Sequence, residues 1–246
     1  MATRLDTIRN LLLTQKKLYV NDLTERFHVS KVTIRKDLTL LEDEGIAERF
    51  YGGIALAGNA FENITEDDSD TIRILLAQKA CEQIQDGDNI FLGSGRTCCC
   101  LAKMLNRFEN LSIVTNNISA LGDLLKTDNR LYLIGGEVTS TDGKTLFASP
   151  ENPNSSTDNI FVTKAFTSIS GIDLQAGLTV HSVVSTHIYH ILPSIARSWY
   201  LMADHSKFDQ IAMYPVAELR QIQYLIADKY PTHYENVLSQ NKIQIL

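Results

Sequence analysis

A short loop rich in glycine and hydroxyl side chains is the first feature of the sequence that could do chemistry. The loop, Gly93-Ser94-Gly95-Arg96-Thr97, lies between an expected strand and an expected helix. Small residues let the backbone approach a ligand, and N–H groups and hydroxyls at a helix start favour a phosphate. Arg96 could add a charge-assisted contact. The loop lacks the ending of a Walker loop and the third glycine of a dinucleotide fingerprint, so a tight structural turn is an equal alternative.

Four further candidate ligand-binding residues lie beyond this loop in the sequence, namely Asn116, Gly135, Asp173 and Lys207. Asn116 and Gly135 could face one crevice, because ligands of parallel sheets usually bind beyond the carboxyl ends of the strands. Asp173 could accept hydrogen bonds from sugar hydroxyls, and Lys207 could pair with a phosphate oxygen. For Lys207, an ion pair with the nearby Asp204 or a turn is the alternative.

A different chemistry is indicated near the N-terminus, where basic and hydroxyl side chains lie on one expected helix, away from its apolar stripe. Arg, Lys and Thr at the start of a helix suit the major groove of DNA, where base edges are read. A following hairpin could meet phosphate or the minor groove. The predicted DNA contacts are Ser30, Lys31, Thr33, Arg35, Lys36, Arg49 and Tyr51. The solvated face of a small helical domain, or a dimerisation module, is the alternative.

The cysteines and histidines do not indicate a metal site. Cys98, Cys99 and Cys100 are consecutive in an expected helix, where successive side chains point about 100° apart and cannot easily converge on one ion. Adjacent cysteines also make a poor disulfide framework, and no signal-peptide pattern is evident, so the sequence indicates the cytoplasm. His187 and His190 could share a helix face, but no third ligand is evident. We expect no metal and no cofactor.

The elements that must position the basic helix are three short helices and a hairpin. Apolar residues recur at helical spacing along the first 29 residues. Ser30 is a good N-cap for the third helix, on which Ile34, Leu38 and Leu41 form one buried stripe. Gly45 is a plausible residue to end it. A strand over 46–51 and a turn into a second strand complete a winged helix-turn-helix.

The elements that must position the glycine loop alternate between strand and helix. The sequence predicts helices over 72–84, from the loop to 105, and up to 125. It predicts short apolar strands over 89–92, 111–114, 131–134, 159–162 and 199–203. Short apolar strands alternating with helices imply a parallel sheet that is covered on both faces. The second domain is therefore expected to be of the α/β class.

Composition and charge fit this division into two parts. The 246 residues are 44% hydrophobic and 21% charged, and the net charge of −6 argues against a generally basic nucleic-acid coat protein. No apolar run approaches the ~18 residues of a membrane helix. Residues 1–57 carry a net charge of 9 − 8 = +1, and the remainder 14 − 21 = −7. We predict a domain over 1–57, a polar, acidic linker over 58–70 and a larger domain over 71–246.

The order of short motifs along the chain resembles the DeoR family of bacterial transcriptional repressors. The N-terminal motifs are Val29 to Leu38, Leu41-Glu42, Gly45 and Arg49 to Gly53. The C-terminal motifs are Asp86 to Asp88, Ser94 to Thr97, Val114 to Asn116, Gly135-Gly136, Gly171 to Asp173, Gly177 to Thr179 and Ala203 to Phe208. The resemblance implies a winged helix-turn-helix followed by an α/β sensor domain similar to ribose-5-phosphate isomerase.

The same resemblance implies that the second domain senses a phosphorylated sugar or sugar alcohol. It carries this role onto Ser94, Gly95, Thr97, Asn116, Gly135, Asp173 and Lys207. Two departures concern the ligand: Arg96 stands where the family usually has a small residue, and the segment 162–167 differs from the usual Phe-rich, glycine-bearing one. Arg96 could occupy the pocket or select a more acidic effector.

Two functions are consistent with these residues. The first is an oligomeric repressor in which a sugar phosphate changes the spacing of the DNA-reading helices. The second is a sugar-phosphate isomerase with an appended DNA-binding module, in which Asp173, Asp204 and Lys207 could supply a base and a cation. The second leaves the DNA-binding module unexplained, so the sequence favours binding without turnover. The expected partners are operator DNA, the effector and further copies of the chain.

Overall fold

The chain divides into two units, Met1–Gln78 and Lys79–Leu246. The computed structural model describes residues 3–57, 69–140, 145–149 and 160–246. The predicted linker over 58–70 lies outside these residues except for Ser69 and Asp70, which begin helix α4 (Ser69–Cys81). The predicted boundaries of the domains therefore stay a prediction.

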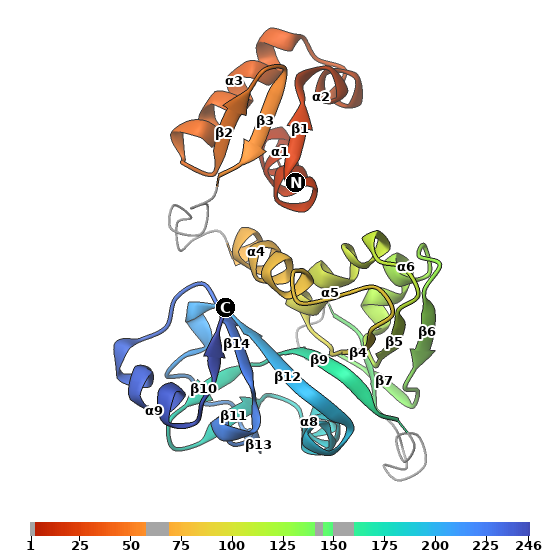
Figure 1. The fold of residues 1–246 in the computed structure, drawn as a ribbon, viewed down its shortest axis with the longest axis vertical. Helices are drawn as coiled ribbons and strands as arrows, with labels where there is room; N and C mark the ends of the chain where they lie inside the picture. Colours follow the sequence, from red (N-terminus) through yellow and green to blue (C-terminus); the bar gives the residue numbers. More distant parts are fainter. Residues whose placement is uncertain (1–2, 58–68, 141–144, 150–159) are drawn as a thin grey trace. The chain divides into compact units, whose positions relative to one another are not determined.

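The first unit contains three helices and a small antiparallel sheet (Figure 1). Its elements are α1 (Arg4–Gln15), β1 (Lys17–Tyr19), α2 (Val20–Phe27), α3 (Lys31–Asp43), β2 (Ala47–Phe50) and β3 (Gly53–Leu56), and the start of α4 follows. The helices pack around one apolar core, which includes Ile8, Leu12, Leu23, Ile34 and Leu38. The fold is the predicted winged helix-turn-helix.

Strand β1 is an element that the sequence did not indicate. It has three residues, of which only Leu18 is buried, so it carries no periodic pattern that could be recognised. It pairs with β3, and the sheet order is β1-β3-β2. The hairpin of β2 and β3 is thereby tied to the helices of the same unit.

The second unit is built on a parallel sheet of seven strands in the order β15-β14-β12-β9-β4-β5-β6. These strands are β4 (Asn89–Leu92), β5 (Ser112–Thr115), β6 (Arg130–Leu133), β9 (Val162–Ser168), β12 (Ala196–Ala203), β14 (Tyr224–Ala227) and β15 (Gln244–Ile245). Every neighbouring pair is parallel. Their carboxyl ends therefore meet at one edge, as the sequence predicted.

Helices and smaller sheets cover this parallel sheet. The helical segments are α5 (Arg96–Ala102), η1 (Leu105–Arg107), η2 (Ile118–Ala120), α6 (Leu121–Leu124), α8 (Val183–Ile195), η3 (His205–Lys207), η4 (Leu219–Gln221), η5 (Thr232–Tyr234) and α9 (Glu235–Gln240). The other strands are β7 (Glu137–Thr139) paired with β8 (Phe147–Ser149), and β10 (Gly171–Asp173), β11 (Gly177–Val180) and β13 (Tyr214–Ala217) in a second sheet. Figure 1 shows α8 and this second sheet on one side of the parallel sheet and α5 on the other.

Several predicted bounds are wrong. The strand expected over 159–162 is β9, which starts at Val162 and runs through polar Thr163 and Lys164. A strand is stable there because Lys164 Nζ lies 2.6 Å from Asp88 Oδ2 and Thr163 Oγ1 donates to the carbonyl of Asn89. The helices expected up to 105 and up to 125 are instead each divided into a short α-helix and a 3₁₀ turn, α5 with η1 and η2 with α6. Asn159 lies outside the described residues.

Candidate functional site

Helix α3 has the start and end that the sequence predicted. Ser30 is its N-cap, and the Oγ of Ser30 accepts a hydrogen bond of 3.2 Å from the N–H of Thr33. Gly45 takes the left-handed conformation, with φ of 68°, directly after the helix. The stripe of Ile34, Leu38 and Leu41 is fully buried. The opposite face of α3 is therefore directed toward solvent.

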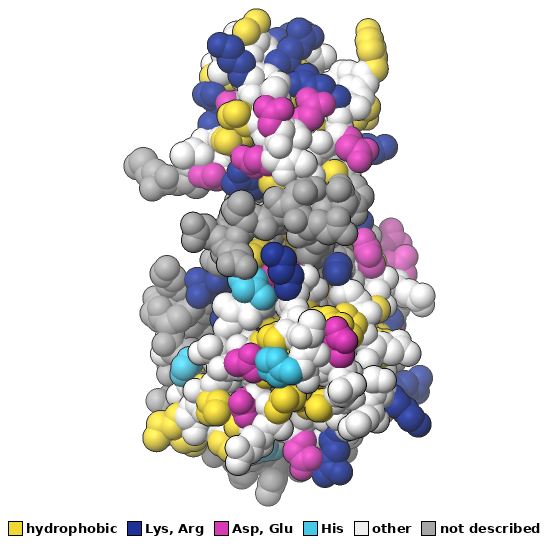
Figure 2. Space-filling view, turned by 90° about the vertical axis from the view of Figure 1, so that its left-hand side faces the viewer, with side chains coloured by type: hydrophobic (Ala, Val, Ile, Leu, Met, Phe, Trp, Pro, Cys, Tyr) yellow, Lys and Arg dark blue, Asp and Glu magenta, His cyan; other side chains and the backbone are white. Residues whose placement is uncertain are grey.

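The outward face of α3 carries the cations predicted to contact DNA. Lys31, Arg35 and Lys36 are exposed, and Thr33 is half-buried. Figure 2 shows Lys and Arg side chains gathered at one end of this unit. The backbone N–H groups at the start of α3 lie beside these side chains. The arrangement suits contact with phosphates and with base edges in a major groove.

The hairpin of β2 and β3 forms the wing. Tyr51 lies in its turn and is fully exposed, as a contact to DNA requires. Arg49 is engaged with α3: its Nε lies 2.5 Å from Glu42 Oε2, and its Nη2 donates to Thr39 Oγ1 and to the carbonyl of Arg35. Arg49 therefore braces the wing against the helix, a role that the sequence did not reveal.

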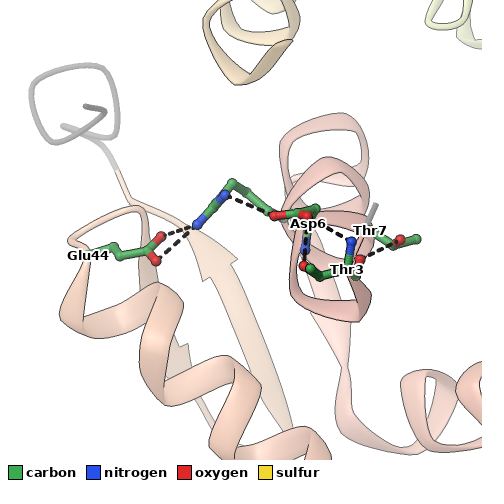
Figure 3. A network of polar contacts seen from close by, with 5 residues as sticks. Thr3, Asp6, Thr7 and Glu44 are labelled. Carbon is green, nitrogen blue, oxygen red and sulfur yellow. Dashed lines mark hydrogen bonds and ion pairs between the residues drawn. The ribbon is translucent and has the colours of Figure 1, made fainter. Parts of the chain in front are cut away.

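Ion pairs hold α3 against α1. The guanidinium of Arg4 donates to both carboxylate oxygens of Asp37, at 2.6 and 3.2 Å. Arg9 bridges Asp6 on α1 and Glu44 at the end of α3, with 2.7 Å to Glu44 Oε2. Figure 3 shows Thr3, Asp6 and Glu44 joined in this network. Hydrogen bonds from Thr3 lower the pKa of Asp6, so this carboxylate remains ionised at neutral pH. These contacts link α1 to α3 and to the C-cap of α3, beside the apolar core that the helices share.

The second candidate site is the carboxyl edge of the parallel sheet. The loop of Ser94 and Gly95 follows β4, Asn116 follows β5, Gly135 follows β6, and Lys207 follows β12. Strand β4 lies between β5 and β9, and β12 is the next strand beyond β9. The topology thus brings these predicted residues to one edge of the sheet.

The glycine loop is packed against the end of β9. Gly95 has a φ of 105°, and a Cβ there would lie 2.5 Å from the Oγ of Ser168. Ser168 Oγ donates to the carbonyl of Ser94 at 3.2 Å. Gly95 is therefore required by the turn itself, which was the structural alternative for this loop. Arg96, the first residue of α5, is exposed, and Thr97 is buried.

The two asparagines after β5 behave differently. The side chain of Asn117 spans the neighbouring loop, donating from Nδ2 to the carbonyl of Gly93 at 3.1 Å. Asn116 is only 3% exposed; its Nδ2 donates to the carbonyl of Ala148, and its buried Oδ1 has no hydrogen-bond partner among the described residues. A buried acceptor without a partner is costly and is a reason to look for a ligand donor. Asn117 was missed because its partner lies 24 residues away.

The end of β12 combines a turn with ion pairs. Asp204 Oδ1 accepts from the N–H of Ser206, and Lys207 Nζ lies 4.0 Å from Asp204 Oδ2. The ion pair and turn considered as alternatives for Lys207 are thus both present. His205 looks isolated in the sequence, but its Nδ1 lies 2.6 Å from Oδ2 of Asp228, the residue after β14. The edge therefore carries both a cation and an Asp–His pair.

Asp173 closes the turn between β10 and β11. Its Oδ1 accepts from the N–H groups of Gln175 and Ala176, at 2.8 and 2.7 Å. These are the contacts of a turn residue. The predicted role of Asp173 toward sugar hydroxyls is untested by them and stays a prediction.

The described residues show neither a metal cluster nor a membrane-spanning helix. In the part of the chain that the structure describes, no group of three or more His, Cys, Asp or Glu side chains could hold a metal ion. No described helix is long and apolar enough to cross a membrane. Cys98 is fully buried, and this burial raises the pKa of its thiol.

Comparison with known families connects the two units to one class of protein. Residues 4–59 match the DeoR-like helix-turn-helix domain, and residues 71–229 match the DeoR C-terminal sensor domain. The chain belongs to the DeoR family. It is therefore a DNA-binding transcriptional regulator with a sensor domain, and the isomerase alternative is not supported.

Curated relatives match almost the whole DeoR-family chain. The glycerol-3-phosphate regulon repressor of Escherichia coli K12 is 30% identical, over 97% of this chain and 95% of the relative. The lactose phosphotransferase system repressor of Staphylococcus epidermidis is 30% identical over 92% and 91%. The regulator IolR of Bacillus subtilis is 28% identical over 92% and 90%.

Solved structures share parts of the fold at low identity. Ribose 5-phosphate isomerase from Plasmodium falciparum aligns with 56% of this chain and 53% of its own, with a TM-score of 0.40 and 14% identity. The delta subunit of eIF2B from Chaetomium thermophilum aligns with 64% and 57%, with a TM-score of 0.46 and 14% identity.

Proposed function

We propose that this DeoR-family protein represses a sugar or sugar-alcohol catabolic operon and that a phosphorylated sugar controls its binding to operator DNA. The observation that carries the proposal is the presence in one chain of both family domains, over residues 4–59 and 71–229. Relatives named as repressors of glycerol-3-phosphate and lactose systems support the chemical class of the effector.

In this proposal the DNA contacts come from the start of α3 and from the wing. Lys31, Arg35 and Lys36 supply exposed cations for base edges and phosphates. Ser30 and Thr33 contribute hydroxyls at the N-terminus of the helix. Tyr51 contacts the backbone or the minor groove. Arg49 acts mainly by holding the wing to the helix, because its guanidinium is bound to Glu42 and Thr39.

The effector is proposed to bind to the predicted domain of residues 71–246, at the carboxyl edge of its parallel sheet. The residues assigned to it are Ser94, Gly95, Arg96, Thr97, Asn116, Gly135, Asp173 and Lys207. The unpartnered buried Oδ1 of Asn116 supports a hydroxyl donor on the ligand, and the half-buried Lys207 supports an anionic group. No resident cofactor is required.

We further propose that the regulator acts in the cytoplasm as a homo-oligomer. Dimeric helix-turn-helix proteins read two half-sites about 34–36 Å apart, so an effector that rotates the subunits can end simultaneous contact. The expected effect of the effector is release of DNA.

Binding to DNA selected by the protein itself tests the proposed function. A duplex is recovered from a random pool, labelled, and titrated with the protein in fluorescence anisotropy, with and without a panel of sugar and sugar-alcohol phosphates. Arg35→Ala should lose DNA binding and keep the thermal shift caused by the active phosphate. Lys207→Ala should keep DNA binding and lose that shift. Failure to select any duplex, or equal binding with every phosphate, contradicts the proposal.

A further inference from the structure

An apolar side chain stands exposed among the cations at the start of α3. Val32 is the second residue of the helix and is 63% exposed. It lies between Lys31 and Thr33 in sequence and one turn before Lys36, so Val32 and Lys36 share a face. That face is opposite the buried stripe that begins with Ile34.

Neither packing nor helix formation accounts for a valine at this position. Val29, three residues earlier, packs against the apolar core of the unit, but Val32 is not among the described residues of that core. Valine is also a poorer helix former than Ala, Glu, Lys or Gln, because its branched side chain loses rotamer freedom. A solvated position on a helix start would be more stable with one of those residues.

The position of Val32 fits contact with a base edge. Residues at the N-terminal end of a recognition helix are those that reach the bases in the major groove. There the apolar group that a base pair presents is the 5-methyl of thymine; the other edges present hydrogen-bond donors and acceptors. Ser30, Lys31, Arg35 and Lys36 supply polar groups around Val32, so the valine adds the one kind of contact that they lack.

We propose that Val32 is a specificity-determining residue that reads thymine through its 5-methyl group in each half-site. The inference rests on the proposed function, since it requires α3 to enter the major groove. It concerns a residue that was not among the predicted DNA contacts. Its side chain makes an apolar contact, so it selects sequence without adding to the salt dependence of binding.

Replacement of thymine by uracil tests this contact, because uracil differs only by lacking the methyl. The probe is a duplex selected from a random pool, with each thymine replaced in turn. Replacing a thymine that Val32 contacts by uracil should weaken binding of the unmodified protein about fourfold, the factor expected for the loss of one buried methyl-sized group. Val32→Ala should bind the thymine and uracil duplexes equally.

Matched variants separate this contact from other effects. Leu40 lies on the same face as Val32, two turns further along, and is 48% exposed. Leu40→Ala should keep the fourfold preference for thymine, and Lys36→Ala should weaken binding to both duplexes by the same factor. Because Val32 is exposed and alanine is the better helix former, Val32→Ala should be at least as stable to urea as the unmodified protein.

Distinct outcomes overturn the inference and the proposed function. Equal binding of every uracil duplex by the unmodified protein, or an undiminished preference for thymine in Val32→Ala, overturns the role of Val32. A change of sedimentation mass in Val32→Ala with an undiminished thymine preference would assign the residue to an interface between copies instead. If no duplex is selected at all, the proposed function fails and not this contact alone.

Discussion

Gly95 and Ser168 meet where two neighbouring strands end, and the space between them decides which residue the loop can hold. Gly95 has a φ of 105°, and a Cβ would lie 2.5 Å from the Oγ of Ser168. Gly95→Ala should therefore lower the free energy of unfolding by about 1–3 kcal/mol, the cost of holding a non-glycine residue in this region of backbone space. Urea unfolding followed by circular dichroism measures the change.

Gly122 provides the matched control for this substitution. It lies in α6, and a Cβ there would meet nothing within 4 Å. Gly122→Ala should leave stability unchanged or raise it by about 0.5–1 kcal/mol, because alanine loses less entropy in a helix. A loss of stability in Gly122→Ala as large as that in Gly95→Ala would contradict the explanation by local geometry.

The cysteine run should show one unreactive thiol beside a more reactive one. Cys98 is fully buried, and burial raises the pKa of its thiol, so little thiolate forms at pH 8. Cys100 is only half-buried. Iodoacetamide at pH 8 should modify Cys100 before Cys98 in the folded protein, as read by fragmentation mass spectrometry. Alkylation in urea, where both thiols should react, is the control. Equal rates of alkylation of Cys98 and Cys100 in the folded protein would contradict the prediction.

Candidate residues at strand ends could be named from the sequence, and side chains whose contacts need a distant partner could not. Asn116 and Lys207 were named because a parallel sheet places strand ends together, and their role in binding stays a prediction. Asn117 and His205 were missed because their partners, the carbonyl of Gly93 and the carboxylate of Asp228, lie more than twenty residues away in sequence. Only the fold brings such pairs into contact.

Among the elements, α3 depends on its N-cap residue, Ser30. The hydroxyl of Ser30 satisfies the N–H of Thr33, which has no partner within the helix. Ser30→Ala should cost about 1 kcal/mol of stability, and Ser30→Asp should retain most of it because aspartate also caps helices well. Urea unfolding of both variants checks this, and equal stability of the alanine and aspartate variants would contradict a capping role.

Elements with strong local signals were predicted with good bounds. Ser30 and Gly45 mark the limits of α3, and the run over 89–92 is β4. Strand β1 was missed because three residues with one buried side chain give no period. The predicted range of β9 was too early in the sequence, because the polar residue Lys164 looks unsuited to a buried strand until its ion pair with Asp88 is known. Tertiary partners override local preference in both cases.

At the scale of the whole molecule, one helix contains residues of both units. Leu75 on α4 packs with Leu13 and Ile46 in the first unit. Four residues later, Lys79 belongs to the second unit, where its Nζ donates to the carbonyl of Leu246 at 3.0 Å.

If the effector controls DNA binding through the protein, the two ligands must influence each other by the same factor. An effector that weakens DNA binding twentyfold, within the ~5–150-fold range of allosteric coupling, must itself bind about twentyfold more weakly to the DNA-bound protein. Calorimetric titration of the active sugar phosphate into the protein, with and without the selected duplex, measures this factor, and anisotropy measures its counterpart. A sugar phosphate that merely competes with DNA phosphates for Lys31 and Arg35 would act equally on Lys207→Ala. The proposed control through the second unit requires that Lys207→Ala abolish both effects together.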